Sequence, residues 1–287
     1  MPRSAWFAVL FAGLLLVGCQ DQGMAERKRR PKFYRSIISL SPSTTELIGT
    51  YADYSALRGR TASDNFPQSI SRVEVVASVK PNYERIVELK PDLIVYDAAL
   101  FNPTDAEKIK SLTKADTFTI DAETVDGFIE EIHELGTLLG SETRMSEYAG
   151  KIHSEMDSAR SDPITTPRVA VLLSGGGRDY IAGTKSFLAS AVQGAGGELV
   201  GPTENKFVPV SPEALVAMNP DLIVVAGTKQ NMKGAVAVLN NPKYQSMKAI
   251  KNRQVRAVNE DVLVRRGARV DQLINALHGL IVAGAAK

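Results

Sequence analysis

One segment of the chain occurs twice in related form. Residues 84–96 read Glu-Arg-Ile-Val-Glu-Leu-Lys-Pro-Asp-Leu-Ile-Val-Tyr, and residues 213–225 read Glu-Ala-Leu-Val-Ala-Met-Asn-Pro-Asp-Leu-Ile-Val-Val. Each copy predicts a short helix, a Pro-Asp turn and a fully buried strand. The copies are separated by the length of a domain, whereas solenoid repeats have a much shorter period. The sequence therefore predicts two similar α/β lobes.

Apolar residues in the middle of the chain recur with the period of a helix. They are Met145, Tyr148, Ala149, Ile152, Met156 and Ala159. This stripe lies on one face of a single helix of about twenty residues. Gly140 ends the preceding helix, and Asp162-Pro163 ends this one. A single long helix is a stiff connection, so we expect little hinge closure between the lobes.

The start of each lobe has a strand followed by a turn. Residues 36–40 and 168–173 are predicted strands. Ser43 and Glu46 have the spacing of a capping box, which predicts a helix from there to about Tyr51 with Glu46 acting as part of the cap. The predicted fold is α/β, with two Rossmann-like lobes (36–140 and 164–287), one long connecting helix (141–163) and a ligand cleft between the lobes.

The N-terminus has the pattern of an export signal. Arg3 precedes an apolar run from Ala5 to Val17 that is too short to span a bilayer core, which needs about 20 residues. Leu16-Val17-Gly18-Cys19 resembles the lipobox of bacterial lipoproteins, in which the Cys thiol is lipidated after cleavage. Residues 1–18 are therefore predicted to be a lipoprotein signal peptide, the alternative being an ordinary signal peptide. Residues 19–35 form a basic tether, which is a solvated linker or lies against anionic lipid head groups.

Composition excludes several function classes. The 287 residues carry 34 Lys+Arg and 32 Asp+Glu, a net charge of +2 that is too balanced for binding nucleic acid by phosphate neutralisation. The single Cys excludes a disulfide framework and a thiolate metal site. No G-x-S-x-G elbow is present, and Ser174-Gly175-Gly176-Gly177 lacks the spacing of a phosphate loop. We expect no enzyme and no resident metal, because the three His residues have no ligand spacing.

Three stretches of the body resemble one protein family. They are Ile37–Glu46 (Ile-Ile-Ser-Leu-Ser-Pro-Ser-Thr-Thr-Glu), Asn82–Ile94 and Val210–Leu215 (Val-Ser-Pro-Glu-Ala-Leu). With the lipobox, the repeat and the long middle helix, they resemble the helical-backbone (class III) periplasmic substrate-binding proteins of ABC importers. That family includes binders of vitamin B12, ferric siderophores and haem. The resemblance covers nearly all of the chain from Ser36 onward.

This resemblance implies a function and a set of partners. It implies an exported, lipid-anchored, monomeric binding protein at the outer face of the cytoplasmic membrane or in the periplasm. Its partners are an ABC permease dimer with separate ATPase subunits, the membrane through the lipid on Cys19, and a small-molecule chelate. It needs no cofactor, since a metal chelate such as cobalamin is the ligand. The alternative from another class is a sensor or surface enzyme that retains the binding fold.

Glu84 and Glu213 open the matched helices, one in each lobe. The resemblance matches them to the paired surface glutamates that dock onto arginines of the permease. The plainer interpretation is that both carboxylates stabilise the N-terminus of a helix, by about 0.3–1 kcal/mol.

The ligand site is expected at the carboxyl ends of the strands, in the cleft between the lobes. The candidate ligand residues are Phe66, Tyr96, Tyr180, Phe207, Asp261, Arg265 and Arg269, with further candidates at Ser63, Asp64, Ser78, Val79 and Phe101. Of these, Tyr180, Phe207, Asp261 and Arg265 match positions that the vitamin B12 binders use, and Phe66-Pro67 matches their aromatic-Pro pair. Each could equally be a core or rim residue.

The chain also departs from the vitamin B12 binders that it resembles. Ser63, Ser78 and Asp97 replace large aromatic residues of those proteins, and no Trp follows residue 18. Arg265, Arg266 and Arg269 could pair with carboxylates of a siderophore or haem, or they could form a solvated face. Tyr96 or Tyr180 could be an axial haem ligand. A corrinoid is favoured, with siderophore and haem as the alternatives.

Overall fold

The computed structural model describes residues 33–162, 165–175, 178–227 and 233–285. The described part up to residue 139 is called the N-terminal lobe, and the described part after residue 161 is called the C-terminal lobe. The elements of the first are β1 (Ile37–Ser39), α1 (Pro42–Tyr51), η1 (Tyr54–Ala56), β2 (Leu57–Thr61), η2 (Gln68–Arg72), β3 (Glu74–Ala77), α2 (Tyr83–Glu88), β4 (Leu93–Asp97), α3 (Pro103–Thr113), β5 (Asp116–Ile120) and α4 (Val125–Leu139).

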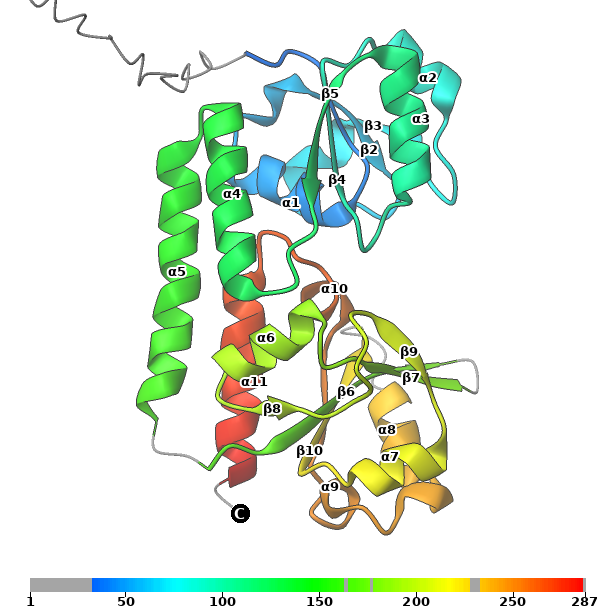
Figure 1. The fold of residues 1–287 in the computed structure, drawn as a ribbon, viewed down its shortest axis with the longest axis vertical. Coiled ribbons are helices and arrows are strands. Elements are labelled where there is room, and N and C mark those ends of the chain that lie inside the picture. Colours follow the sequence, from blue (N-terminus) through cyan, green and yellow to red (C-terminus); the bar gives the residue numbers. More distant parts are fainter. Residues whose placement is uncertain (1–32, 163–164, 176–177, 228–232, 286–287) are drawn as a thin grey trace, which may run out of the picture. The chain divides into compact units, whose positions relative to one another are not determined.

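The chain then passes through α5 (Glu142–Ser161), the element that corresponds to the predicted connecting helix, into the C-terminal lobe (Figure 1). The elements of that lobe are β6 (Arg168–Gly175), β7 (Arg178–Ala182), α6 (Phe187–Gly194), β8 (Glu198–Leu199), β9 (Phe207–Val210), α7 (Pro212–Met218), β10 (Leu222–Gly227), α8 (Lys233–Asn240), η3 (Pro242–Tyr244), α9 (Lys248–Lys251), β11 (Val255–Asn259), α10 (Glu260–Leu263) and α11 (Val270–Ala285).

The sheet of the N-terminal lobe is parallel throughout, with strand order β3-β2-β1-β4-β5. The direction of the strand order reverses between β1 and β4, so a crevice is expected outside the carboxyl ends of these two strands. The C-terminal sheet has the order β11-β10-β6-β7-β9, in which β7 runs antiparallel to both of its neighbours. The two lobes therefore share the α/β class, but the second sheet is mixed.

The repeat has a clear structural reason. In each copy the Pro-Asp turn lies beside the start of a neighbouring strand, β1 in the first lobe and β6 in the second. The Asp carboxylate accepts hydrogen bonds from backbone N–H groups at or just before the start of that strand. Asp92 accepts from Ser36 (3.0 Å) and Arg35 (2.8 Å), and Asp221 accepts from Arg168 (3.0 Å). The same Pro-Asp pair thus fixes the register of β4 on β1 and of β10 on β6.

A continuous apolar core joins the lobes. The long helix α5 contributes Met145, Tyr148, Ile152 and Met156, all buried, to one cluster that contains residues of both sheets. The helices α4, α5 and α11 lie together along one side of the two lobes (Figure 1). The lobes are therefore packed on a shared helical layer and not merely tethered by it.

The first βα turn departs from the predicted cap. Ser41 is the N-cap of α1, since its hydroxyl accepts from the N–H of Thr44, and the helix begins at Pro42. The Ser41 hydroxyl also accepts from the N–H of Asp97 (2.9 Å), which ties the turn to the end of β4. The capping box predicted from Ser43 and Glu46 is wrong, because Ser41 fills that position and the Glu46 carboxylate is engaged elsewhere.

Candidate functional site

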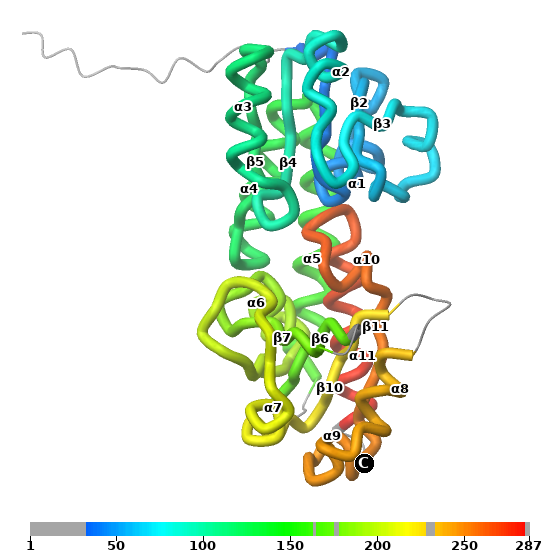
Figure 2. The backbone as a smooth tube through the Cα atoms, turned by 90° about the vertical axis from the view of Figure 1, so that its right-hand side faces the viewer, coloured from blue at the N-terminus to red at the C-terminus, as the bar shows by residue number. Residues whose placement is uncertain are grey.

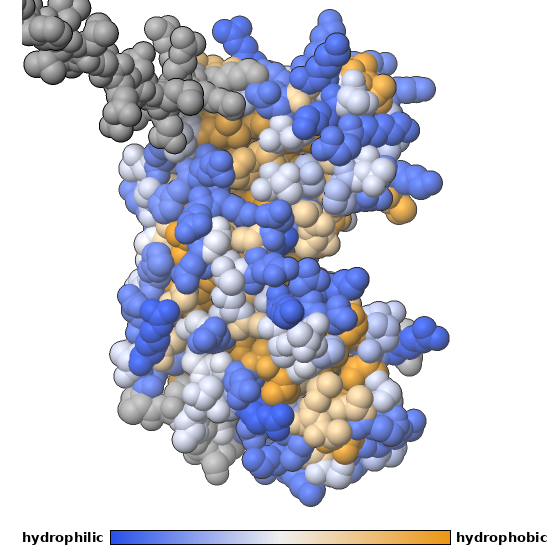
Figure 3. Space-filling model, in the orientation of Figure 1, coloured by the Kyte–Doolittle hydropathy of each residue, from blue (hydrophilic) through white to orange (hydrophobic). Residues whose placement is uncertain are grey.

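The candidate site lies between the lobes. The surface is hollowed there on the side away from α4 and α5 (Figure 3). The N-terminal lobe meets the loop between α10 and α11 of the other lobe there, because Glu46 of α1 and Asp97 at the end of β4 bond to arginines of that loop. Figure 2 shows that loop lying directly against the N-terminal lobe beside α1.

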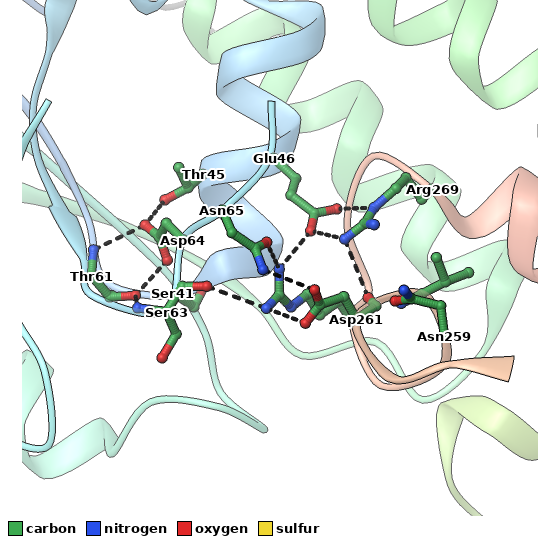
Figure 4. A network of polar contacts seen from close by, with 12 residues as sticks. Ser41, Thr45, Glu46, Thr61, Ser63, Asp64, Asn65, Asn259, Asp261 and Arg269 are labelled. Atoms are coloured by element: carbon green, nitrogen blue, oxygen red, sulfur yellow. Dashed lines mark hydrogen bonds and ion pairs between the residues drawn. The ribbon is translucent and has the colours of Figure 1, made fainter. Parts of the chain in front are cut away.

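An ion-paired cluster centred on Glu46, called the floor cluster, joins the two lobes. This residue of α1 is 1% exposed, and its carboxylate accepts from Arg265 (3.0 Å) and from Arg269 (2.5 and 3.1 Å) of the other lobe (Figure 4). Arg265 also donates to the Asn65 side chain (2.8 Å) and pairs with Asp261 (2.5 Å). Two guanidinium groups are thus held by the carboxylates of both lobes.

Arg266 lies at the carboxyl ends of β4 and β5. Its guanidinium forms an ion pair with Asp97 at the end of β4 and donates to the carbonyl of Ala122. The Arg266 side chain is 9% exposed and that of Asp97 is 1% exposed. An arginine of the C-terminal lobe is therefore buried against the carboxyl ends of two strands of the N-terminal sheet.

These contacts correct one interpretation of the sequence. Arg265, Arg266 and Arg269 do not form a solvated face, because all three are largely buried and paired with Glu46, Asp97 or Asp261. Buried charges persist only with such partners, since desolvation costs several kcal/mol per ion. Glu46, which the sequence predicts to be part of a helix cap, is their partner; its place directly before the apolar pair Leu47-Ile48 is the one local signal of burial.

A second polar group lies at the end of β2. The carboxylate of Asp64, which is 5% exposed, accepts from the hydroxyls of Thr45 (2.6 Å) and Thr61 and from the N–H of Thr61 (2.9 Å). Burial raises the pKa of Asp64. The Ser63 carbonyl accepts from Arg265 (3.2 Å), so this turn is also tied to the floor cluster. Asp64 therefore shapes the site rather than facing open solvent.

The aromatic candidates separate into two groups. In the N-terminal lobe, the Arg269 guanidinium lies over the ring of Phe66 at 4.8 Å from the ring centre. Tyr96 is buried against Phe101, with ring centres 5.8 Å apart, in the outer core of that lobe. Phe66 thus belongs with the floor cluster, whereas Tyr96 does not contact it.

Tyr180 and Phe207 share one face of the C-terminal sheet. In the β7–β9 pair, Tyr180 is opposite Pro209 and Ala182 is opposite Phe207. Because directly opposite residues lie on the same face and side chains alternate along a strand, Tyr180 and Phe207 point to the same side. Tyr180 is 37% exposed and Phe207 is half-buried. In the N-terminal lobe, Ser78 and Val79 lie in the exposed loop after β3.

Glu84 and Glu213 occupy equivalent positions in the two lobes. Each is the second residue of a short helix, after the N-caps Asn82 and Ser211, and both carboxylates are exposed. The backbone N–H of Glu213 and the Ser211 hydroxyl lower the pKa of Glu213. The helix α2 follows β3 and α7 follows β9, so each lobe presents one exposed glutamate at the start of a short helix.

Metal-ligand geometry is absent from the described residues: they contain no cluster of three or more His, Cys, Asp or Glu suited to an ion. His278 bonds the Ala195 carbonyl (3.1 Å) and Asp162 (2.8 Å), and His133 lies beside Ser146 (3.3 Å).

Within the described ranges, no helix is both long enough and apolar enough to cross a membrane. Cys19 and its lipobox lie outside the described residues.

Comparisons with known proteins agree with this architecture. The chain is 24% identical to the uncharacterised ABC transporter substrate-binding lipoprotein YvrC of Bacillus subtilis, covering 95% of this chain and 94% of that protein. It is 27% identical to the vitamin B12-binding protein of Yersinia pestis, covering 83% and 80%. The structure of the periplasmic haem-binding protein RhuT from Roseiflexus sp. RS-1 superimposes with a TM-score of 0.73 at 23% identity, covering 88% of this chain and 99% of RhuT.

The sequence also matches a family profile described as periplasmic binding protein, over residues 37–262. That match spans most of the chain and includes both sheets and the connecting helix. The predicted family and fold class are therefore confirmed, and the chain belongs to the periplasmic binding protein family.

Proposed function

We propose that this protein is the substrate-binding lipoprotein of an ABC importer and that it captures a metal chelate for delivery to the permease. The observation that carries this proposal is the hollow between two lobes fixed to each other by a buried ion cluster. Its aromatic walls are proposed to come from both lobes: Phe66, whose ring contacts Arg269, from one, and Tyr180 and Phe207, which share a sheet face, from the other. A bulky planar ligand fits such walls, since ring faces supply large apolar contact.

The remaining candidate ligand residues form the floor. Asp261 is one-third exposed and is held by its ion pair with Arg265. Arg269 holds Phe66 through the contact of its guanidinium with the ring. Tyr96 is the exception, because it is buried against Phe101 in the N-terminal core and is assigned a packing role there. No bond is made or broken in this function; specificity arises from the shape of the hollow and from a few polar contacts.

A corrinoid is the favoured ligand, supported by the similarity to a vitamin B12-binding protein. Calorimetric titration of residues 20–287 with cyanocobalamin tests this. We expect one-to-one binding at micromolar or tighter, about −8 kcal/mol or stronger. Absence of heat with cyanocobalamin, together with binding of haemin, would move the assignment to haem, in line with the similarity to RhuT.

Glu84 and Glu213 are proposed to dock onto basic groups of the permease. Rim charges of this kind determine register and association rate more than affinity. We expect the double variant Glu84→Lys/Glu213→Lys to abolish uptake while leaving ligand affinity unchanged. The matched control Glu107→Lys/Glu198→Lys makes the same charge change at one exposed site in each lobe and should leave uptake intact. Normal uptake by the first variant would overturn the docking role.

Anchoring through Cys19 has a direct test. We expect the full-length chain to sediment with membranes and the Cys19→Ser variant to be released, because stable attachment needs two or more acyl chains. Equal membrane association of both forms would exclude the lipid anchor.

A further inference from the structure

Arg178 is the first residue of β7 and lies two positions before Tyr180. Side chains two apart in a strand point to the same face, so Arg178 shares the face of Tyr180 and Phe207. The alternate residues point the other way: Asp179 accepts from the Tyr244 hydroxyl (2.5 Å), and Ile181 is buried in the core beneath the sheet. The register thus separates Arg178 from that core.

This face of β7 and β9 is turned towards the other lobe. The opposite face packs against α7, α8 and the segments that follow them, and Figure 1 shows those helices on the far side of β7 and β9 from the N-terminal lobe. Phe207 and Ala182, in contrast, pack against the core cluster shared by both lobes. Arg178 therefore lies on the wall of the hollow, at the outer end of the aromatic pair.

Arg178 also differs in its partners from the arginines of the floor. Arg265, Arg266 and Arg269 are each paired with a buried or half-buried carboxylate. Arg178 is exposed, and its guanidinium forms no hydrogen bond or ion pair with the residues that the structure describes. Its guanidinium is thus available to a ligand, while those of the floor are already neutralised.

We propose that Arg178 pairs with an anionic oxygen group at the edge of the bound chelate, beside a ring that contacts Tyr180 and Phe207. This inference rests on the proposed function. A guanidinium binds two oxygens of a phosphate or carboxylate through a planar pair of N–H donors. The group is the phosphodiester of a complete corrinoid or a carboxylate of haem, and the two sources can be distinguished.

The experiment compares wild type, Arg178→Gln and the control Arg144→Gln, an exposed arginine on α5. Each is titrated with cyanocobalamin, with dicyanocobinamide, which lacks the phosphodiester, and with haemin. We expect Arg178→Gln to lower the affinity for the chelate that wild type binds by about tenfold, and the control variant to leave that affinity unchanged. A loss of affinity for cyanocobalamin but not for dicyanocobinamide identifies the phosphodiester as the partner of Arg178. A loss of affinity for haemin identifies a carboxylate as that partner.

Two results would overturn the inference. The first is that wild type binds a chelate and Arg178→Gln binds it equally well, or that Arg178→Gln loses the same affinity for cyanocobalamin and for dicyanocobinamide. Arg178 then does not pair with an anionic group, while the proposed function stands. If wild type binds none of the three chelates, the corrinoid and haem assignments of the proposed function fail, and this contact fails with them.

Discussion

At the scale of single residues, Glu46 decides how the two lobes meet. Its carboxylate is 1% exposed and accepts from two arginines of the other lobe, at 2.5 to 3.1 Å. Removing one member of a buried ion pair leaves the others desolvated without compensation, which costs more than the pair itself contributed. The cluster is therefore sensitive to the loss of a single charge.

We predict that Glu46→Gln lowers the free energy of unfolding by about 3 kcal/mol, because Arg265 and Arg269 then lose their shared carboxylate. Urea denaturation followed by circular dichroism measures this. Glu84→Gln, an isosteric change at an exposed glutamate, should stay within about 0.5 kcal/mol of wild type. Equal stability of the two variants would show that the cluster is not a stabilising contact.

Sequence could suggest the arginines of this cluster but not their partner. Arg265 and Glu46 are separated by 219 positions, and a single sequence shows no link between them. Glu46 also fits a local capping pattern, so the local explanation was sufficient until the burial of its carboxylate was visible. Long-range pairing of charges is decided by packing, whereas caps depend only on neighbours in the chain.

Glu131 is expected to make the free energy of unfolding depend on pH. Its carboxylate accepts from the N–H groups of Asp121 (3.0 Å) and Ala122 (2.9 Å), while its second oxygen is buried without a partner. Burial raises the pKa of Glu131 to about 7. The folded state therefore holds a proton more tightly than the unfolded chain. The resulting stability is fully present below pH 4.5, the ordinary value, and is lost as pH rises through about 7.

We accordingly expect Glu131→Gln to flatten the decline in unfolding free energy between pH 4.5 and about 7, since a neutral amide keeps one acceptor oxygen and does not titrate. Urea denaturation across that range measures the slope. Glu134→Gln, an exposed change on the same helix, should keep the wild-type slope. A wild-type slope in Glu131→Gln as well would contradict the role of this carboxyl.

At the scale of elements, the features predicted from sequence are those with strong local periodicity. The repeat predicted β4 and β10, and the apolar stripe predicted α5 close to its observed bounds. The antiparallel pair β7–β9 had no such signal, because β9 is short and contains Pro209. Pro lacks an N–H and is tolerated only where a ladder bond is not needed, as on the edge strand that β9 forms.

The packing of α5 on α11 depends on one hydroxyl. Buried Tyr148 donates to the Gly267 carbonyl (2.6 Å) and accepts from the N–H of Val270 (2.9 Å), and its ring stacks on Tyr51 at 4.4 Å. We predict that Tyr148→Phe lowers the unfolding free energy by about 2 kcal/mol, because two backbone groups are left buried and unpaired. Thermal and urea denaturation measure the change. Tyr54→Phe, at a partly exposed ring, is the control, and an equal effect would contradict the prediction.

At the scale of the whole described fold, three kinds of contact oppose movement of the lobes. They share a continuous apolar core through α5, they meet in an ion cluster whose members are largely buried, and Tyr148 of α5 is bonded to the loop that carries the arginines. Packed interiors change between discrete arrangements and do not deform freely. Ligand capture should therefore involve side chains and rim loops more than rotation of one lobe.

This leads to a prediction about the distance between the lobes. Leu112 of α3 and Val236 of α8 are exposed, one in each lobe, and can be changed to Cys and spin-labelled in a Cys19→Ser background. We expect the mean distance between the labels to change by less than about 2 Å when a saturating chelate is added, as in pre-organised complexes. In the same labelled protein, Glu46→Gln should broaden the distance distribution, because the floor cluster no longer fixes the lobes. A shift of several ångströms on binding, with an unchanged distribution in the variant, would show that the lobes close by rotation and that the cluster does not restrain them.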